Sequence, residues 1–245
     1  MNSMEIMHFV ILASVLEPIP EKIGCTTRSR DWQDKSKLEY FLISGCNIGI
    51  IFYELSERIK NNDYRQPTMI YDLAYKAQQF SFKNRLGGKI NFGIIELLIP
   101  IIATQVIKNN YDGITVLDQV GDILKFTSKE DVQYHWKFRK IAREVSKEFP
   151  SDCSYEVENM YDYYKLYKNE LENNVHKEYL TNFKRIKKAY NVIEKNLSND
   201  NLLNSSVIAY NTILKDCQNY CGLAADYICV ALYLYLSKFP NTIII

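Results

Sequence analysis

Apolar residues recur at intervals of three and four along most of the chain, the spacing that keeps one face of a helix buried. One such stripe consists of Leu38, Phe41, Leu42, Gly45, Gly49, Phe52, Leu55, Ser56 and Ile59. No segment shows the strict alternation of apolar and polar residues that is typical of a half-buried strand. The pattern therefore predicts an all-α protein, a single-domain multi-helix bundle spanning residues 1–245.

The same periodicity places the individual helices. They are expected at residues 3–16, 38–60, 67–82, 92–109, 128–149, 154–171, 172–197, 201–217 and 221–238. In the longest of these, six apolar residues step by four and three in turn and form a seam for a neighbouring helix. The seam consists of Tyr179, Phe183, Ile186, Tyr190, Ile193 and Leu197.

Charge and composition exclude several classes of function. The chain has 30 Lys and Arg against 29 Asp and Glu, so it lacks the basic field that nucleic acid requires. The apolar stretches 90–107 and 222–236 contain Glu96 and Asp226, which argues against a membrane span. The first apolar run, residues 9–16, has no Lys or Arg before it, so we do not expect it to be a signal peptide, and no cysteine has zinc-site spacing. We expect a cytoplasmic protein with reduced cysteines.

Two stretches do not fit a bundle built only for packing. The first, residues 17–34, reads EPIPEKIGCTTRSRDWQD, and Pro18 and Pro20 end the helix before it. It is rich in acids and bases, and long irregular segments inside compact domains are usually functional. The alternative is that these charges only solvate a surface loop.

The second stretch, residues 84–93, reads NRLGGKINFG and leads directly into an apolar helix. Gly87, Gly88 and Gly93 let the backbone approach a ligand closely, and the helix N-terminus offers free N–H donors. This arrangement favours phosphate binding, although a glycine pair before a helix is more often a simple turn.

Together the two stretches resemble the triphosphoribosyl-dephospho-CoA synthase family, in particular its archaeal-type members. The matching segments are Glu17, EKIG with Lys22 and Gly24, Arg28, DWQD at 31–34, FLISG at 41–45, GGKINFG at 87–93 and LLIP at 97–100. The final segment, LSKFPNTIII at 236–245, is similar to a late motif of the family. The resemblance implies a transferase that moves the triphosphoribosyl group of ATP to the ribose hydroxyl of 3′-dephospho-CoA and releases adenine.

The resemblance also implies the roles of acidic residues. Such a reaction leaves positive charge on the ribose carbon, and so it needs nearby carboxylates and a base for the hydroxyl. We expect Asp31 and Asp34 to be Mg²⁺ ligands or the base, because one helical turn would direct both at one ion. Glu17 is expected to be the second acid. Alternatively, Asp31 caps the helix that follows.

The remaining predicted site residues bind substrate. Lys22 and Arg28 would hold phosphates, and Asn91 would orient the ribose or a phosphate. Backbone N–H groups at Gly24, Gly87, Gly88 and Gly93 would approach the ligand. His135 and His176 are expected at the edge of the core, and the apolar end at Ile243–Ile245 suggests a homo-oligomer.

The chain also departs from the family pattern in the glycine turn. Lys89 and Ile90 stand where the family has Asn and Thr, so Lys89 would bind a phosphate by charge. These departures leave a second hypothesis open, a catalytically diverged nucleotide-binding or assembly protein of the same fold.

Overall fold

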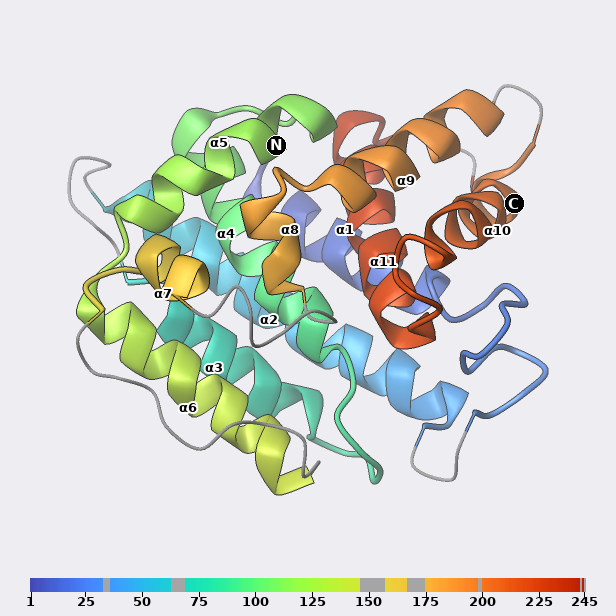
Figure 1. Cartoon of the computed structure of the whole chain (residues 1–245), viewed down its shortest axis with the longest axis horizontal. Helices are drawn as coiled ribbons and strands as arrows, with labels where there is room; N and C mark the ends of the chain where they lie inside the picture. The colour runs from blue at the N-terminus through green and yellow to red at the C-terminus, as the bar shows by residue number, and fades with distance from the viewer. Residues whose placement is uncertain are drawn as a thin grey trace.

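The computed structural model describes residues 1–32, 36–62, 69–145, 157–166, 175–197, 200–242 and 244, without the side chains of 142–145. Within these ranges the chain forms eleven helices and no strand, which confirms the predicted all-α class (Figure 1). The helices are α1 (Ser3–Leu16), α2 (Leu38–Asn61), α3 (Tyr71–Ser81), α4 (Phe92–Lys108), α5 (Gly113–Lys125), α6 (Lys129–Val145), α7 (Met160–Leu166), α8 (His176–Leu180), α9 (Lys184–Asn196), α10 (Leu202–Leu214) and α11 (Cys221–Lys238).

Helix α5 is absent from the sequence-based prediction, although it is amphipathic. It follows a sharp break at Asn109, whose φ of 46° lies in the left-handed region and ends α4. The axes of α4 and α5 differ in direction by 99°.

The predicted single helix over 172–197 is wrong, because the chain breaks between α8 and α9. Asn182 and Phe183 both adopt left-handed conformations, with φ of 53° and 55°. The Glu178 carboxylate then accepts hydrogen bonds at 3.2 Å from the backbone N–H groups of Arg185 and Ile186, which would otherwise be unpaired at the start of α9. The apolar seam remains buried through Ile193, but two helices carry it.

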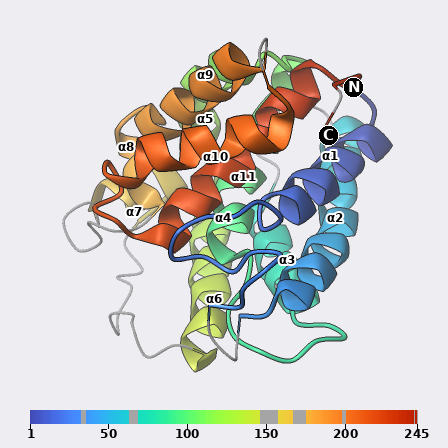
Figure 2. The same ribbon diagram turned by 90° about the vertical axis from the view of Figure 1, so that its right-hand side faces the viewer.

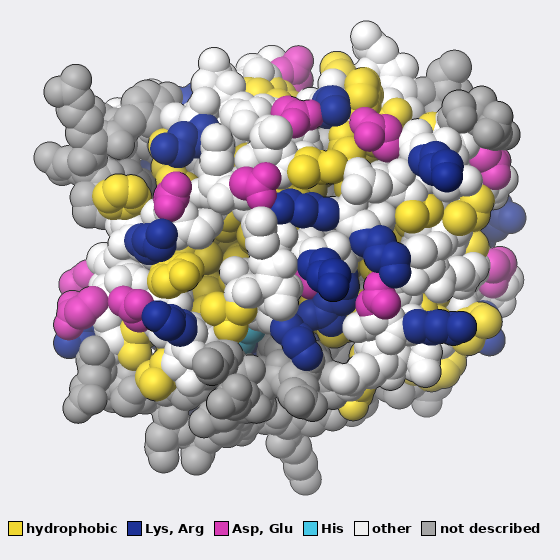
Figure 3. Space-filling model, turned by 45° about the horizontal axis from the view of Figure 1, so that its top comes forward, with side chains coloured by type: hydrophobic (Ala, Val, Ile, Leu, Met, Phe, Trp, Pro, Cys, Tyr) yellow, Lys and Arg dark blue, Asp and Glu magenta, His cyan; other side chains and the backbone are white. Residues whose placement is uncertain are grey.

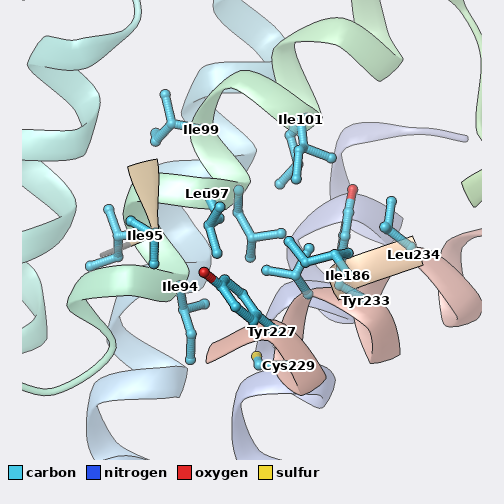
Figure 4. Packing of buried hydrophobic residues seen from close by; sticks show 14 of the residues in the cluster. Ile94, Ile95, Leu97, Ile99, Ile101, Ile186, Tyr227, Cys229, Tyr233 and Leu234 are labelled. Atoms are coloured by element: carbon cyan, nitrogen blue, oxygen red, sulfur yellow. The ribbon is translucent and has the colours of Figure 1, made fainter. Parts of the chain in front are cut away.

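Helices α4 and α11 form the centre of the molecule (Figure 1). Every residue of α4 from Phe92 to Val106 is buried. Figure 4 shows Ile94 and Leu97 of α4 packed close to Tyr227 of α11. Pairs of helices, α1 with α2, α3 with α6 and α9 with α10, surround this centre (Figure 2).

Pro100 lies inside α4 and changes its hydrogen bonding. Proline has no N–H group, so the carbonyl of Glu96, one turn earlier, loses its helical donor. The hydroxyl of Tyr179 donates to that carbonyl at 2.6 Å instead. The replacement ties α8 to α4 at the level of Glu96.

By length and composition alone, α2 and α11 could each cross a membrane, and the bent pair α4 and α5 could form a third span. Here α11 packs against α1, α4, α9 and α10, which bury most of its apolar surface. That packing accounts for its composition, and the absence of a membrane span stays a prediction.

Candidate active site

A pocket of about 580 Å³ lies where three parts of the chain meet. These parts are the loop after α1, the glycine turn before α4, and the first turns of α11 (Figure 2). Among the predicted site residues, Glu17, Gly24, Lys89, Asn91 and Gly93 line it. Segments far apart in the sequence therefore converge, as the two unusual stretches suggested.

A second hollow, of about 810 Å³, lies between α9 and α10 and is lined by several lysines. Figure 3 shows Lys and Arg side chains gathered near the middle of one face of the molecule. Two lysines of the hollow are engaged by carboxylates, Lys187 by Asp118 at 2.5 Å and Lys188 by Asp216 at 2.7 Å. No predicted site residue lines this hollow, so the smaller pocket is the candidate active site.

Glu17 and Lys22 form a buried ion pair at the edge of the pocket. The Lys22 ammonium donates to both the carboxylate and the backbone carbonyl of Glu17. Glu17 Oε2 accepts no hydrogen bond from the part of the chain that the structure describes. Lys22 was expected to hold phosphate, but here it fixes Glu17 and does not line the pocket.

Two other charged residues of the loop after α1, Glu21 and Arg30, make hydrogen bonds within the loop. Glu21 accepts hydrogen bonds from the Thr27 hydroxyl at 2.9 Å and from the Ser29 N–H at 3.2 Å. Arg30 donates to the carbonyl of Lys22 at 3.3 Å. Arg28 is exposed and lies outside the pocket lining. Hydrogen bonds therefore hold the described part of the loop together, although the side chains of Glu21, Arg28 and Arg30 are exposed to solvent.

Asp31 is exposed and does not line the pocket. Its Oδ1 accepts a hydrogen bond at 3.1 Å from the N–H of Leu38, the first residue of α2, in agreement with the capping alternative. Asp31 is not in a helix, and α2 begins at Leu38, as the apolar stripe predicted. That one helical turn directs Asp31 and Asp34 at a single ion stays a prediction. Asp34 lies outside the described residues. Trp32 and Ser36 line the pocket, which places Asp31 beside its rim.

The glycine pair forms a turn folded by an arginine. Gly87 has a φ of 97°, a conformation that glycine adopts without strain. The Arg85 guanidinium donates to the carbonyls of Leu86 and Gly88, at 3.2 and 3.0 Å. Neither Gly87 nor Gly88 lines the pocket. The turn instead presents Lys89, whose Nζ lies 4.6 Å from the centre of the Phe92 ring.

Asn91 connects the glycine turn to α2. Its φ of 58° is left-handed, and its amide donates to the Ser44 hydroxyl at 3.0 Å. Its Oδ1 is buried and accepts no hydrogen bond from any residue that the structure describes. An unpaired buried acceptor is costly, so this atom can receive a donor from a ligand.

Gly24 and Gly93 are required by the approach of α11. A Cβ at position 24 would overlap Cys221 Sγ, and a Cβ at position 93 would overlap Asp226 Oδ2. The glycines were expected to let the backbone approach a ligand. At positions 24 and 93 they instead let the first turns of α11 pack closely. The Asp226 carboxylate therefore lies against the N-terminal turn of α4.

Comparison with known proteins agrees with this architecture. The family model described as ATP:dephospho-CoA triphosphoribosyl transferase matches residues 3–219. The chain belongs to this family. No curated protein and no solved structure matches the chain. The matched region includes the loop after α1, the glycine turn and α4. It ends before α11 and before the late motif expected at 236–245.

In this family member, a second acid, Asp226, also faces the pocket. It lines the pocket, and no residue in the described ranges donates a hydrogen bond or forms an ion pair with it. Burial raises the pKa of Asp226 to about 8, with a further contribution from the charges of Glu17 and Glu96, against the opposing effect of Lys89.

Glu96, which also lines the pocket, has several partners. Its Oε1 lies 2.6 Å from His135 Nε2 and 3.5 Å from Arg139 Nη1, and it also contacts His176 Nε2. Burial alone raises the pKa of Glu96, but His176, Arg139 and His135 outweigh it and hold that pKa well below its usual range. Glu96 Oε2 is buried and accepts no hydrogen bond from the described part of the chain.

His135 and His176 were expected at the edge of the core, but both lie inside it. Burial lowers the pKa of His135, and it lowers the pKa of His176 to about 4, so both rings are neutral at pH 7. One carboxylate and two imidazoles would suit a transition metal. Arg139 Nη1, however, lies 2.6 Å from His176 Nε2 and supplies the positive charge there. The cluster is an ion-pair network that keeps Glu96 ionised.

Glu96 and Asp226 are the functional candidates that sequence reasoning missed. Each is the single charged residue in an apolar stretch, 90–107 for Glu96 and 222–236 for Asp226. Burying a lone acid is expensive unless a partner or a function compensates. A single acid in each of two apolar stretches was therefore the signal in the sequence that could have indicated these residues.

Proposed function

We propose that this chain transfers the triphosphoribosyl group of ATP to the ribose hydroxyl of 3′-dephospho-CoA and releases adenine. The observation that carries the proposal is the pocket in which the loop after α1 meets the glycine turn before α4. These two segments carry the family motifs. Three carboxylates, those of Glu17, Glu96 and Asp226, line the same pocket.

Glu96 is suited to the positive charge that develops on the ribose carbon when adenine leaves. Its partners keep it ionised, and its Oε2 accepts no hydrogen bond within the described ranges. A fixed negative charge in a buried site stabilises such a transition state more strongly than the same charge in water. We assign Glu96 this electrostatic role.

Glu17 is suited to accept the proton of the attacking hydroxyl. Lys22 binds its Oε1 and fixes the orientation of the carboxylate. Its Oε2 has no donor among the residues described here, so that oxygen can accept a proton from the ligand.

The phosphates and the ribose have separate binding groups. Lys89 and the N-terminal turn of α4 would attract the triphosphate, and Asn91 Oδ1 would accept a hydrogen bond from a ribose hydroxyl. Mg²⁺ would accompany the triphosphate and neutralise part of its charge. Asp31, exposed beside the rim, would be a ligand of that ion.

The direct test is incubation with ATP, Mg²⁺ and 3′-dephospho-CoA, followed by quantification of adenine and the mass of the acceptor product. We expect adenine and product in equal amounts, and loss of both when Mg²⁺ is chelated. Glu17→Gln should lower the rate by a factor on the order of 10² or more. Glu130→Gln, an exposed acid on α6, is the matched control.

The second hypothesis, a diverged nucleotide-binding protein, is supported by Lys89 and Ile90 in the glycine turn. Ile90 lines the pocket with an apolar side chain that is 2% exposed. ATP binding by calorimetry without any adenine release would favour this hypothesis over the transferase. The double variant Lys89→Asn, Ile90→Thr would then be expected to restore turnover.

A further inference from the structure

We infer that Asp226 is the general acid that protonates adenine as it leaves. The inference rests on the proposed function and deepens it, because that function leaves the leaving group without a proton donor. Asp226 lies on α11, beyond the part of the chain that the family model matches.

The position of Asp226 follows from Gly93. Asp226 Oδ2 occupies the space that a Cβ at position 93 would fill. Gly93 and Glu96 are three residues apart on α4, so they lie on the same face of the helix, about one turn apart. The carboxylates of Asp226 and Glu96 are therefore neighbours, and both line the pocket.

The groups that face Asp226 favour its protonated form. Glu17 from the end of α1 and Glu96 from α4 are acidic, and Lys89 from the glycine turn is the opposing cation. With a pKa of about 8, most Asp226 carboxyl groups carry a proton at pH 7. The triphosphate of ATP adds negative charge to the pocket and strengthens this preference.

Two neighbouring acids with opposite protonation states are the usual arrangement for glycosidic bond cleavage. In this scheme the bond between the ribose carbon C1′ and adenine N9 breaks, and its electron pair goes to the adenine ring. The Asp226 carboxyl gives its proton to a ring nitrogen of adenine. The acceptor oxygen bonds to C1′, and its proton goes to Glu17. Exchange with solvent through the open pocket then restores both acids.

The test compares two donors in the parent and in Asp226→Asn. Natural ATP needs a proton on its departing base, whereas 7-methyl-ATP carries a base that is already cationic and leaves as neutral 7-methyladenine. With ATP, we expect Asp226→Asn to lower kcat by a factor on the order of 10²–10⁴ with little change in KM. With 7-methyl-ATP, the parent and the variant should differ less than about tenfold. Asp122→Asn, an exposed acid on α5, is the matched control.

Each outcome decides a different claim. An active parent whose Asp226→Asn variant keeps its rate with ATP, or loses rate equally with both donors, overturns the acid role and leaves the transferase proposal intact. A parent that releases no base from either donor overturns the proposed function, and the acid role with it. A decline of kcat/KM above about pH 8 in the parent that is absent in the variant is a second expected result.

Discussion

Glu96 and Asp226 are both acids on the central helices, Glu96 fully buried and Asp226 half-buried, and their surroundings have opposite effects on their charge. Each is a lone acid in an apolar central helix, and their carboxylates meet at one pocket. Glu96 is surrounded by His135, His176 and Arg139, whereas Asp226 has no hydrogen-bond or ion-pair partner among the described residues. The partners of Glu96 therefore keep it ionised despite its complete burial.

The largest expected effect is on the free energy of unfolding when either acid is replaced by its amide. Glu96→Gln leaves the Arg139 guanidinium buried beside two neutral rings, and removing one partner of a buried ion pair costs about 3–5 kcal/mol. Asp226→Asn removes no partner and should not lower the free energy of unfolding at pH 7. Urea denaturation of both variants measures the difference. Equal losses would mean that the two acids do not differ in pairing.

The pH dependence of stability sharpens the same contrast. Asp226 has a pKa of about 8 in the folded chain against 3.8 as its ordinary value, so the fold favours its protonated form. This contribution is complete below about pH 4 and is lost as the pH rises to about 8. Asp226→Asn should therefore gain stability relative to the parent over that window. Thermal unfolding at several pH values tests this, and a constant difference would contradict the raised pKa.

A smaller effect is expected from Gly93→Ala, which tests the contact that brings the two acids together. The new Cβ would overlap Asp226 Oδ2, and overpacking of this kind costs about 1–3 kcal/mol. Adding Asp226→Ala should recover most of that loss. A double-mutant cycle by denaturant unfolding measures the coupling, and strictly additive losses would show that Asp226 does not lie against Gly93.

The smallest expected effect comes from Lys89→Ala, which removes the cation that opposes the acids around Asp226. ATP should bind more weakly by about 1–3 kcal/mol, a range typical of a hydrogen bond to a charged group, while adenosine binding changes little. Calorimetry at low and high salt measures both ligands. Identical affinities of parent and variant for ATP would make Lys89 a surface charge without a role in the pocket.

The fold was largely readable from the sequence because apolar periodicity reports which helix faces are buried. The periodicity did not reveal the break after Leu180. There Asn182 and Phe183 adopt left-handed conformations, and the apolar spacing continues across the break unchanged. The helix over 113–125 was also missed. It follows α4 closely in the sequence, and the chain turns sharply at Asn109 between the two helices.

The candidate site was readable only in part. Proline and glycine mark the loop and the turn locally, and so the sequence pointed to Glu17, Lys89 and Asn91, which line the pocket. The network around Glu96 depends on His135 and Arg139 from α6 and on His176 from α8. Residues that far apart in the sequence leave no local pattern, and only the cost of a buried acid indicates that partners must exist.

The most direct test of the account is the protonation state of Asp226 itself. Carboxyl ¹³C NMR of aspartate-labelled protein, with the Asp226→Asn spectrum for assignment, follows this group through a pH titration. We expect a midpoint near pH 8, with Asp226 mostly protonated at neutral pH. A midpoint near the ordinary aspartate value of 3.8 would mean that Asp226 is charged like Glu96, and would contradict the division of roles between them.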